Sequence, residues 1–231
     1  MKPIVKSKFI LLAMSMIFSG CTASFEPRVS SSDLAKSRLP TAKEIKSGLE
    51  VSVEEYASPH KSRRAFDADI APHGVLPLLL RVENKGTDNY KIQRSQIRAF
   101  LGGESLPPLQ GYEAANQGAA RDYVWNSLVN TAAIGPLAIY FWPATMALSA
   151  KHTQTVNQRI ERHFESLELT DALVKADETV AGFVYFKLPD KGKSLENLSV
   201  EVTVEADLSE EPRGKQVTYR FSLPTLELSG S

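Results

Sequence analysis

The chain contains one cysteine, Cys21, and its thiol is the group whose surroundings best suggest a chemistry. Residues 1–8 carry three lysines and no acid, and residues 9–18 form a ten-residue apolar run. The small residues Ser19 and Gly20 then lead directly into Cys21. An apolar run of this length is typical of an export signal and is too short to span a bilayer. Because one thiol cannot form an internal disulfide, we expect another use for it in an exported chain.

The order Ser19-Gly20-Cys21 after an apolar run resembles the lipobox of bacterial lipoproteins. The resemblance implies that residues 1–20 are a lipoprotein signal peptide, cleaved between Gly20 and Cys21. It also implies a diacylglycerol on the Cys21 thiol and an acyl chain on the freed α-amino group. Phe18 departs from the pattern, in which leucine is the usual residue. Three acyl chains would hold the mature protein on a membrane without a spanning helix.

Thr22 bears on which membrane holds the anchor. In enterobacteria-like systems an aspartate directly after the modified cysteine retains a lipoprotein in the inner membrane. A threonine there implies a lipid-anchored protein of the cell envelope, on the outer membrane and facing the periplasm. The alternative is an ordinary secretory signal, or a short anchor, with an incidental cysteine.

The other reactive side chains form no constellation that predicts an enzyme. His152 and His163 lie eleven residues apart, about 16 Å along a helix, so they cannot bind one metal ion. No serine stands in a G-x-S-x-G elbow and no glycines form a phosphate-binding loop. The acidic pairs are expected to be solvated; they are Glu54-Glu55, Asp67/Asp69 and Glu210-Glu211. We expect no catalytic residue, no metal and no cofactor beyond the lipid on Cys21.

Charge also argues against a nucleic-acid partner. The chain has 27 basic and 27 acidic residues, and removing residues 1–20 takes away Lys2, Lys6 and Lys8 and no acid. The mature chain is therefore slightly acidic, whereas a nucleic-acid surface needs a clustered basic field.

Hydropathy predicts strands on both sides of a central segment. Residues 49–53 alternate apolar and polar side chains, which predicts one face in a core, and residues 76–82 form an apolar run typical of a strand buried on both faces. A strand from Tyr90 to Leu101 changes register at residues 94–96, which predicts a bulge or a turn. Further strands are predicted over residues 179–188, 198–205 and 217–223, the last two as a hairpin. The pattern predicts a β-sandwich over residues 48–231.

The remaining segments interrupt or precede this sandwich. Residues 21–47 are polar and lack a sustained period, which predicts a lipidated N-terminus and a flexible tether reaching roughly 25–30 Å, with a short helix near residues 41–47. Two helices are predicted over residues 119–134 and 151–170. The second carries an apolar stripe of Val156, Ile160, Phe164 and Leu167. We therefore expect a helical insertion at about residues 112–175.

Two motifs add a family resemblance. The segment GVLPLLLRVENKGTDNYKI (74–92) and the later ETVAGFVYFKLP (178–189) resemble the immunoglobulin-like domains of uncharacterised bacterial lipoproteins. The resemblance implies a mainly β, immunoglobulin-like sandwich, α+β overall once the apolar helical insertion is included. It also implies an adhesive, scaffolding or accessory role without catalysis.

The insertion contains a long uncharged stretch, from residue 123 to residue 150. It has three interpretations: a membrane span, a buried helical hairpin, or an exposed apolar patch that contacts lipid headgroups or a protein partner. Gly135-Pro136 and Pro143 argue against a span, because each interrupts a helix. Aromatic residues favour membrane and protein interfaces, and those in this stretch are Trp125, Tyr140, Phe141 and Trp142.

These observations lead to one function and one alternative. We expect a membrane-anchored envelope lipoprotein that acts as a non-catalytic structural or protein-interaction module, with the membrane and an envelope protein as partners. The alternative is a carrier or sensor of hydrophobic ligands or lipids that uses the apolar insertion.

Overall fold

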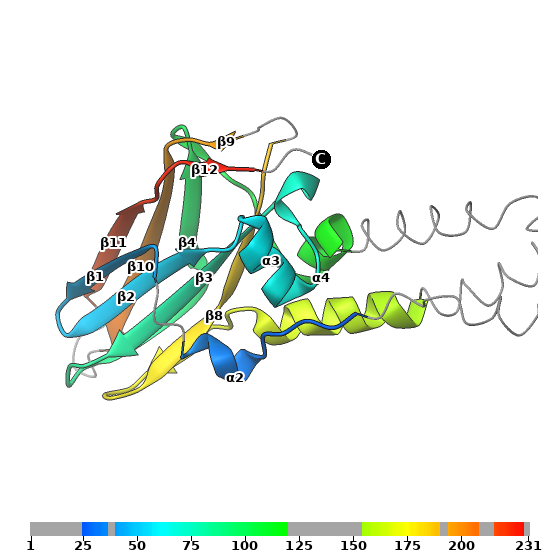
Figure 1. Cartoon of the computed structure of the whole chain (residues 1–231). Coiled ribbons are helices and arrows are strands. Elements are labelled where there is room, and N and C mark those ends of the chain that lie inside the picture. The colour runs from blue at the N-terminus through cyan, green and yellow to red at the C-terminus, as the bar shows by residue number, and fades with distance from the viewer. Residues whose placement is uncertain (1–24, 37–39, 120–153, 190–193, 208–214, 229–231) are drawn as a thin grey trace, which may run out of the picture.

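The computed structural model describes residues 25–36, 40–119, 154–189, 194–207 and 215–228 (Figure 1). The signal peptide, the lipidation site and most of the uncharged stretch lie outside these residues. Within them, no helix is both long and apolar enough to cross a membrane.

Strands are the commonest element of the described chain and form two antiparallel sheets, which confirms the predicted mainly β class. Sheet A has the order β1-β2-β3-β8-β6, and sheet B has the order β11-β10-β4-β5 with β7 paired to β4. Sheet A contains β1 Ala42–Lys46, β2 Leu49–Glu55, β3 Val75–Asn84, β8 Thr179–Lys187 and β6 Pro108–Leu109. Sheet B contains β11 Gln216–Ser222, β10 Leu198–Asp207, β4 Asn89–Leu101, β5 Glu104–Ser105 and β7 Ala172–Val174. A small third sheet pairs β9 Ser194–Leu195 with β12 Leu226–Glu227.

Short helices join these strands. They are α2 Ser31–Leu34, α3 Pro59–Phe66, the 3-10 turn η1 Ala71–His73, α4 Gly111–Ala114 and the π-helical turn η2 Ala115–Ala119. A longer helix covers residues 154–167. Figure 1 shows α2, α3, α4 and this helix gathered beside β8, on the side of sheet A away from sheet B.

The inner core lies between the two sheets and follows the two-residue period of the strands. Alternate residues of β3 and β10 point into it, and all are almost fully buried: Leu76, Leu78, Leu80, Val82, Leu198, Val200, Val202 and Val204. Because side chains alternate across a strand, one face of each sheet contributes to this core. The predicted hairpin is confirmed, with Val202 paired to Tyr219.

A second core covers the outer face of sheet A. The other alternating residues of β3 and β8, including Leu79, Phe183 and Tyr185, point into it. The helical layer supplies their partners: Phe66, Phe164 and the rest of the predicted stripe. The ring centroid of Phe66 lies 4.7 Å from that of Phe164 and 5.0 Å from that of Phe183. Sheet A is thus buried on both faces, which explains the continuous apolar run at residues 76–82.

Strand β4 carries the predicted irregularity. Ile97 pairs with Val202 and Ile92 pairs with Val204, so the four residues between them stand opposite Thr203 alone. This is a β-bulge, and it confirms the register change predicted at residues 94–96. The bulge places the backbone N–H of Arg94 2.8 Å from Asp171 Oδ1.

The predicted tether is wrong for its described part. Residues 42–46 are not a helix but the edge strand β1, whose Ile45 pairs with Glu50. Val29 and Leu34 are buried in the second core. This polar segment folds because its isolated apolar residues pack against the outer face of sheet A. The periodicity of the segment itself does not show that such a surface is present.

The insertion boundaries are also corrected. Residues 172–174 are not part of an inserted helix but form β7, which pairs with β4. The helix over residues 154–167 is not appended to a finished sandwich, because Ile160, Phe164 and Leu167 are at most 1% exposed against sheet A. The described ends of the predicted insertion therefore belong to the domain.

Phe164→Ala should lower the free energy of unfolding by about 3–5 kcal/mol, because it leaves a cavity among Phe66, Phe183 and Tyr185. Gln158→Ala, at an exposed position of the same helix, should change it by less than about 0.5 kcal/mol. Urea denaturation followed by far-ultraviolet circular dichroism measures both. Equal midpoints for the two variants would mean that the helix is not part of the cooperative core.

Candidate functional site

The residues that the sequence singled out for function lie outside the described part of the chain. They are Gly20, Cys21, Trp125, Tyr140, Phe141 and Trp142. The described residues show instead where the segments that carry them join the fold. Three places are relevant: the docked N-terminal segment, the base of the helical layer, and a polar pocket on sheet A.

The N-terminal segment, residues 25–36, is held on the helical layer by backbone and ring contacts. The N–H of Glu26 donates to Asp67 Oδ2 at 2.9 Å, and the N–H of Arg28 donates to the carbonyl of Arg64 at 3.0 Å. The Phe25 ring meets His163 edge-on, with centroids 5.4 Å apart. The chain is therefore packed against the domain from Phe25 onward.

His163 joins three elements at this point. Its Nε2 lies 2.7 Å from the carbonyl of Ala65 in α3, and a carbonyl only accepts, so Nε2 carries the donated proton. Burial lowers the pKa of His163, which favours the neutral ring, and the bond to Ala65 opposes this in part. A neutral ring can pack against Phe25 without the cost of burying a charge. His163 thus connects the N-terminal segment, α3 and the helix over residues 154–167.

At the base of the helical layer, polar contacts join β4, α4 and the C-terminal end of the helix over residues 154–167. Arg94 forms an ion pair with Glu168 at 2.5 Å and donates to Gln110 Oε1 at 2.6 Å. The N–H of Gly111 donates to Glu168 Oε2 at 3.1 Å. Burial raises the pKa of Glu168, and the Arg94 charge opposes that rise. A side chain at position 111 would meet the Glu168 carboxylate and the backbone of Glu165, so the close approach requires glycine.

The two described ends of the helical segment run side by side. Gly111 lies against Glu165 and Glu168, and five residues later Asn116 Nδ2 donates to Glu161 Oε1 at 3.0 Å. Because the contacts move forward from residue 111 to 116 in one segment and backward from residue 168 to 161 in the other, the two segments are antiparallel. Residues 119 and 154, where the described parts stop, therefore lie toward the same end of the layer.

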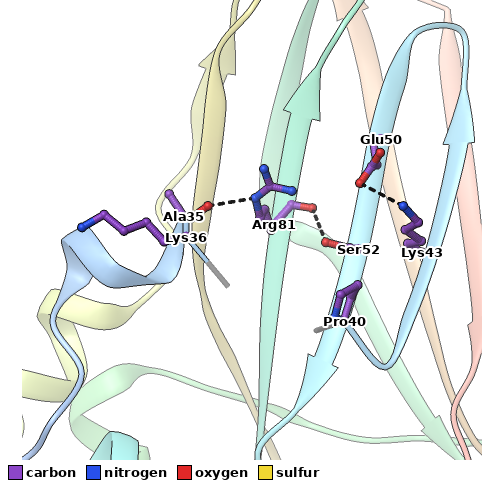
Figure 2. Close-up of a pocket in the computed structure, with 7 residues that line it drawn as sticks. All are labelled: Ala35, Lys36, Pro40, Lys43, Glu50, Ser52 and Arg81. Atoms are coloured by element: carbon purple, nitrogen blue, oxygen red, sulfur yellow. Dashed lines mark hydrogen bonds and ion pairs between the residues drawn. The ribbon is translucent and has the colours of Figure 1, made fainter. Parts of the chain in front are cut away.

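A polar pocket of about 380 Å³ lies on the outer face of sheet A, beside α2. Figure 2 shows its lining: Ala35, Lys36, Pro40, Lys43, Glu50, Ser52 and Arg81. This part of the outer face, over β1, β2 and the end of β3 that holds Arg81, carries charged side chains. The part over the start of β3 and over β8, which meets the helical layer, is apolar.

Each charged group of the pocket has an oppositely charged partner. Glu50 accepts a hydrogen bond from Lys85 at 2.9 Å and lies 3.8 Å from Lys43 Nζ. The bond from Lys85 lowers the pKa of Glu50 against the opposing effect of its burial. Arg81 donates through Nε to the carbonyl of Ala35 and through Nη2 to Glu83, at 3.0 and 2.7 Å. Glu50 is therefore a carboxylate held by lysines, which makes it a poor general base.

Two further observations bear on chemistry. The Ser52 hydroxyl donates weakly to the carbonyl of Arg81 at 3.4 Å, so it is oriented by the strand rather than by a base. Among the described residues, no three histidine, cysteine, aspartate or glutamate side chains are grouped to bind a metal ion. The arrangement of the pocket is that of an ion-pair network which closes the polar half of sheet A.

Sequence reasoning missed this network. The polar face of β2 was expected in solvent, yet Glu50, Ser52 and Glu54 are only 5–7% exposed. Glu54 and Glu55, predicted to be solvated, both lie within 3.2 Å of Lys61 Nζ. One signal was available: Arg81 is the only charge within the apolar run at residues 75–82, and it stands opposite Ser52 in the register.

Comparison with known proteins adds little. No family model matches the chain, and no curated protein sequence matches it. A solved structure described as a "putative lipoprotein (ycdA) from Bacillus subtilis" aligns with a TM-score of 0.36 and 12% identity. The alignment covers 80% of this chain and 39% of that one. At that TM-score the likeness is too weak to carry an inference about fold or function.

Glu50→Gln should destabilise the domain at neutral pH, because it removes the charge that Lys85 binds. The folded-state pKa of Glu50 lies below its ordinary value of 4.5, so the stabilisation is present above that value and is lost as the pH falls through the lowered pKa. Thermal melts between pH 7 and pH 3 should show the two proteins converging below pH 4.5. The exposed control Glu104→Gln should melt like the native chain. A constant difference at every pH would contradict the assignment.

Proposed function

We propose that the chain is a lipid-anchored lipoprotein of the bacterial envelope, modified on Cys21, that acts as a non-catalytic structural or protein-interaction module. The order Ser19-Gly20-Cys21 after the apolar run supports the anchor. Thr22 supports a place on the outer membrane, facing the periplasm. Two facing antiparallel sheets support the immunoglobulin-like character of the domain, as does the turn at Asn84.

The Asn84 turn explains the V-E-N motif in physical terms. The fully buried Asn84 amide donates to the carbonyls of Asp88 and Val174, and its Oδ1 accepts from the N–H of Gly86. The side chain thus closes the hairpin between β3 and β4 and ties it to β7. The motif reports how the strands are joined, which fits a structural module.

The observation that carries the proposal is the docking of residues 25–36. Phe25 already packs against His163, so only three residues separate the fold from Cys21, and the four Cα–Cα steps between Cys21 and Phe25 span at most about 14 Å. A free coil from residue 22 to residue 47 would have reached roughly twice as far. With Cys21 lipidated, the helical layer must therefore lie close to the membrane surface.

This geometry also bears on the uncharged stretch. Residue 154 precedes His163 by nine residues, which is about 13 Å along a helix axis. The described chain therefore resumes after the stretch about 13 Å from His163, a distance close to the length of the connection between Phe25 and Cys21. This supports contact of Trp125, Tyr140, Phe141 and Trp142 with the headgroup region in preference to a distant protein partner.

Lipidation is tested by metabolic labelling with a palmitate analogue. Cys21→Ser should abolish labelling and leave the signal peptide uncleaved. Adding Ser24→Cys to that variant restores a thiol three residues away and should not restore labelling, because the modifying enzyme reads the residues before the cysteine. Labelling that survives in Cys21→Ser would contradict the proposal.

The orientation is tested by energy transfer from a labelled cysteine to headgroup dyes. Because lipidation consumes the Cys21 thiol, one introduced cysteine is labelled uniquely. A dye at Gln158→Cys, on the helical layer, should transfer strongly, and a dye at Lys215→Cys, which precedes β11 in sheet B, should transfer weakly. Equal transfer from the two positions, or stronger transfer from position 215, would contradict an orientation with the helical layer toward the membrane.

A further inference from the structure

The helix over residues 154–167 carries acidic and basic residues on different sides of its buried stripe, with Arg162 between the two sides, one turn from both Arg159 and Glu165. With the buried stripe as reference, Glu161, Glu165 and Glu168 follow the side that meets α4 and η2. Arg159 precedes His163 by one helical turn and so lies on the opposite side, toward the N-terminal segment and α3. Arg162 is exposed next to it.

Three more arginines extend this basic side. Arg28 and Arg64 are joined through their backbones, and Arg63 precedes Arg64 in the last turn of α3. All are exposed. We call the set the arginine patch: Arg28, Arg63, Arg64, Arg159 and Arg162.

The arginines of the patch differ from the charged residues of the polar pocket on sheet A, which are held in ion pairs. Three acids stand near the patch: Glu165 is one turn after Arg162, Glu26 precedes Arg28 by two residues, and Asp67 follows α3, where its Oδ2 accepts the backbone N–H of Glu26. Within the described residues, no carboxylate forms an ion pair with any of the five guanidinium groups, whereas Arg81 and Arg94 both have one. Five exposed arginines in a mature chain of slightly negative net charge form a local field that calls for an anionic partner.

The position of the patch identifies that partner. We propose that the arginine patch binds the anionic headgroups of the leaflet that holds the lipid on Cys21, an inference that rests on the proposed function. Phe25 packs against His163, one helical turn from Arg159, and its connection to the anchor is at most about 14 Å long. Guanidinium groups suit phosphate oxygens, which they bind through paired hydrogen bonds.

The arginine patch determines how the domain is oriented on the membrane, and the acyl chains keep the protein on it. Three acyl chains already exceed what stable anchoring requires, so loss of the arginines should not release the protein. Headgroup contact instead fixes which face of the domain meets the membrane. It keeps sheet B, on the far side of sheet A from the helical layer, directed toward the periplasm.

The test uses the mature lipidated protein in nanodiscs of phosphatidylcholine alone or with added phosphatidylglycerol. Phenylglyoxal modifies accessible arginines, and mass spectrometry gives the rate at each position. In the anionic nanodiscs the patch should react at least about threefold more slowly, because each basic residue gains free energy near such a surface. Arg98 and Arg220, exposed on sheet B, should react equally in both. Salt at 1 M should remove the protection, because the screening length falls to about 3 Å.

Charge reversal separates this inference from the proposed function. Arg159→Glu with Arg162→Glu should abolish protection of Arg28, Arg63 and Arg64 while the intact mass still shows three acyl chains. The matched reversal, Arg98→Glu with Arg220→Glu, should leave the protection unchanged. Equal rates in both lipids for a protein that carries its lipid would overturn the patch alone. A protein without lipid on Cys21 would overturn the proposed function and with it the inference.

Discussion

Burial of sheet A on both faces is the constraint on which the rest of the molecule depends. Strands β3 and β8 carry large apolar residues on both sides, so sheet B alone cannot remove them from water. The second face needs its own cover, and no single segment provides it. The helix over residues 154–167, α3 and the segment at residues 25–36 assemble from distant parts of the chain around Phe66, Phe183 and Tyr185. Each of them is consequently positioned by the same two strands.

This shared cover fixes the start of the described chain. The N-terminal segment cannot act as a free tether, because its apolar residues Val29 and Leu34 complete the second core. Under the proposed lipidation of Cys21, its docking would shorten the connection to the anchor and keep the arginine patch near it. A long coil would let the domain sample many orientations, whereas a segment packed at Phe25 would present a defined face to the bilayer.

The outer face of sheet A is also divided by polarity. Its apolar half binds helices, and its polar half, over β1 and β2, is closed by ion pairs around Glu50, Arg81 and Lys61. Such pairs add little stability for each contact, but a buried carboxylate without its lysine is costly. The division therefore determines where the helical layer stops.

The sequence by itself determined what depends on neighbouring residues: the strands at 76–82 and 198–205, the bulge at 94–96 and the stripe from Val156 to Leu167. These are periods, which local sterics and side-chain alternation dictate. Only the tertiary structure decided that residues 42–46 form a strand, that Glu50 and Glu54 are buried, and that the described ends of the predicted insertion belong to the core. Each of these depends on a surface supplied by residues far away in the chain. Whether a residue is buried depends on the surface that packs against it, and a local sequence pattern does not show that surface.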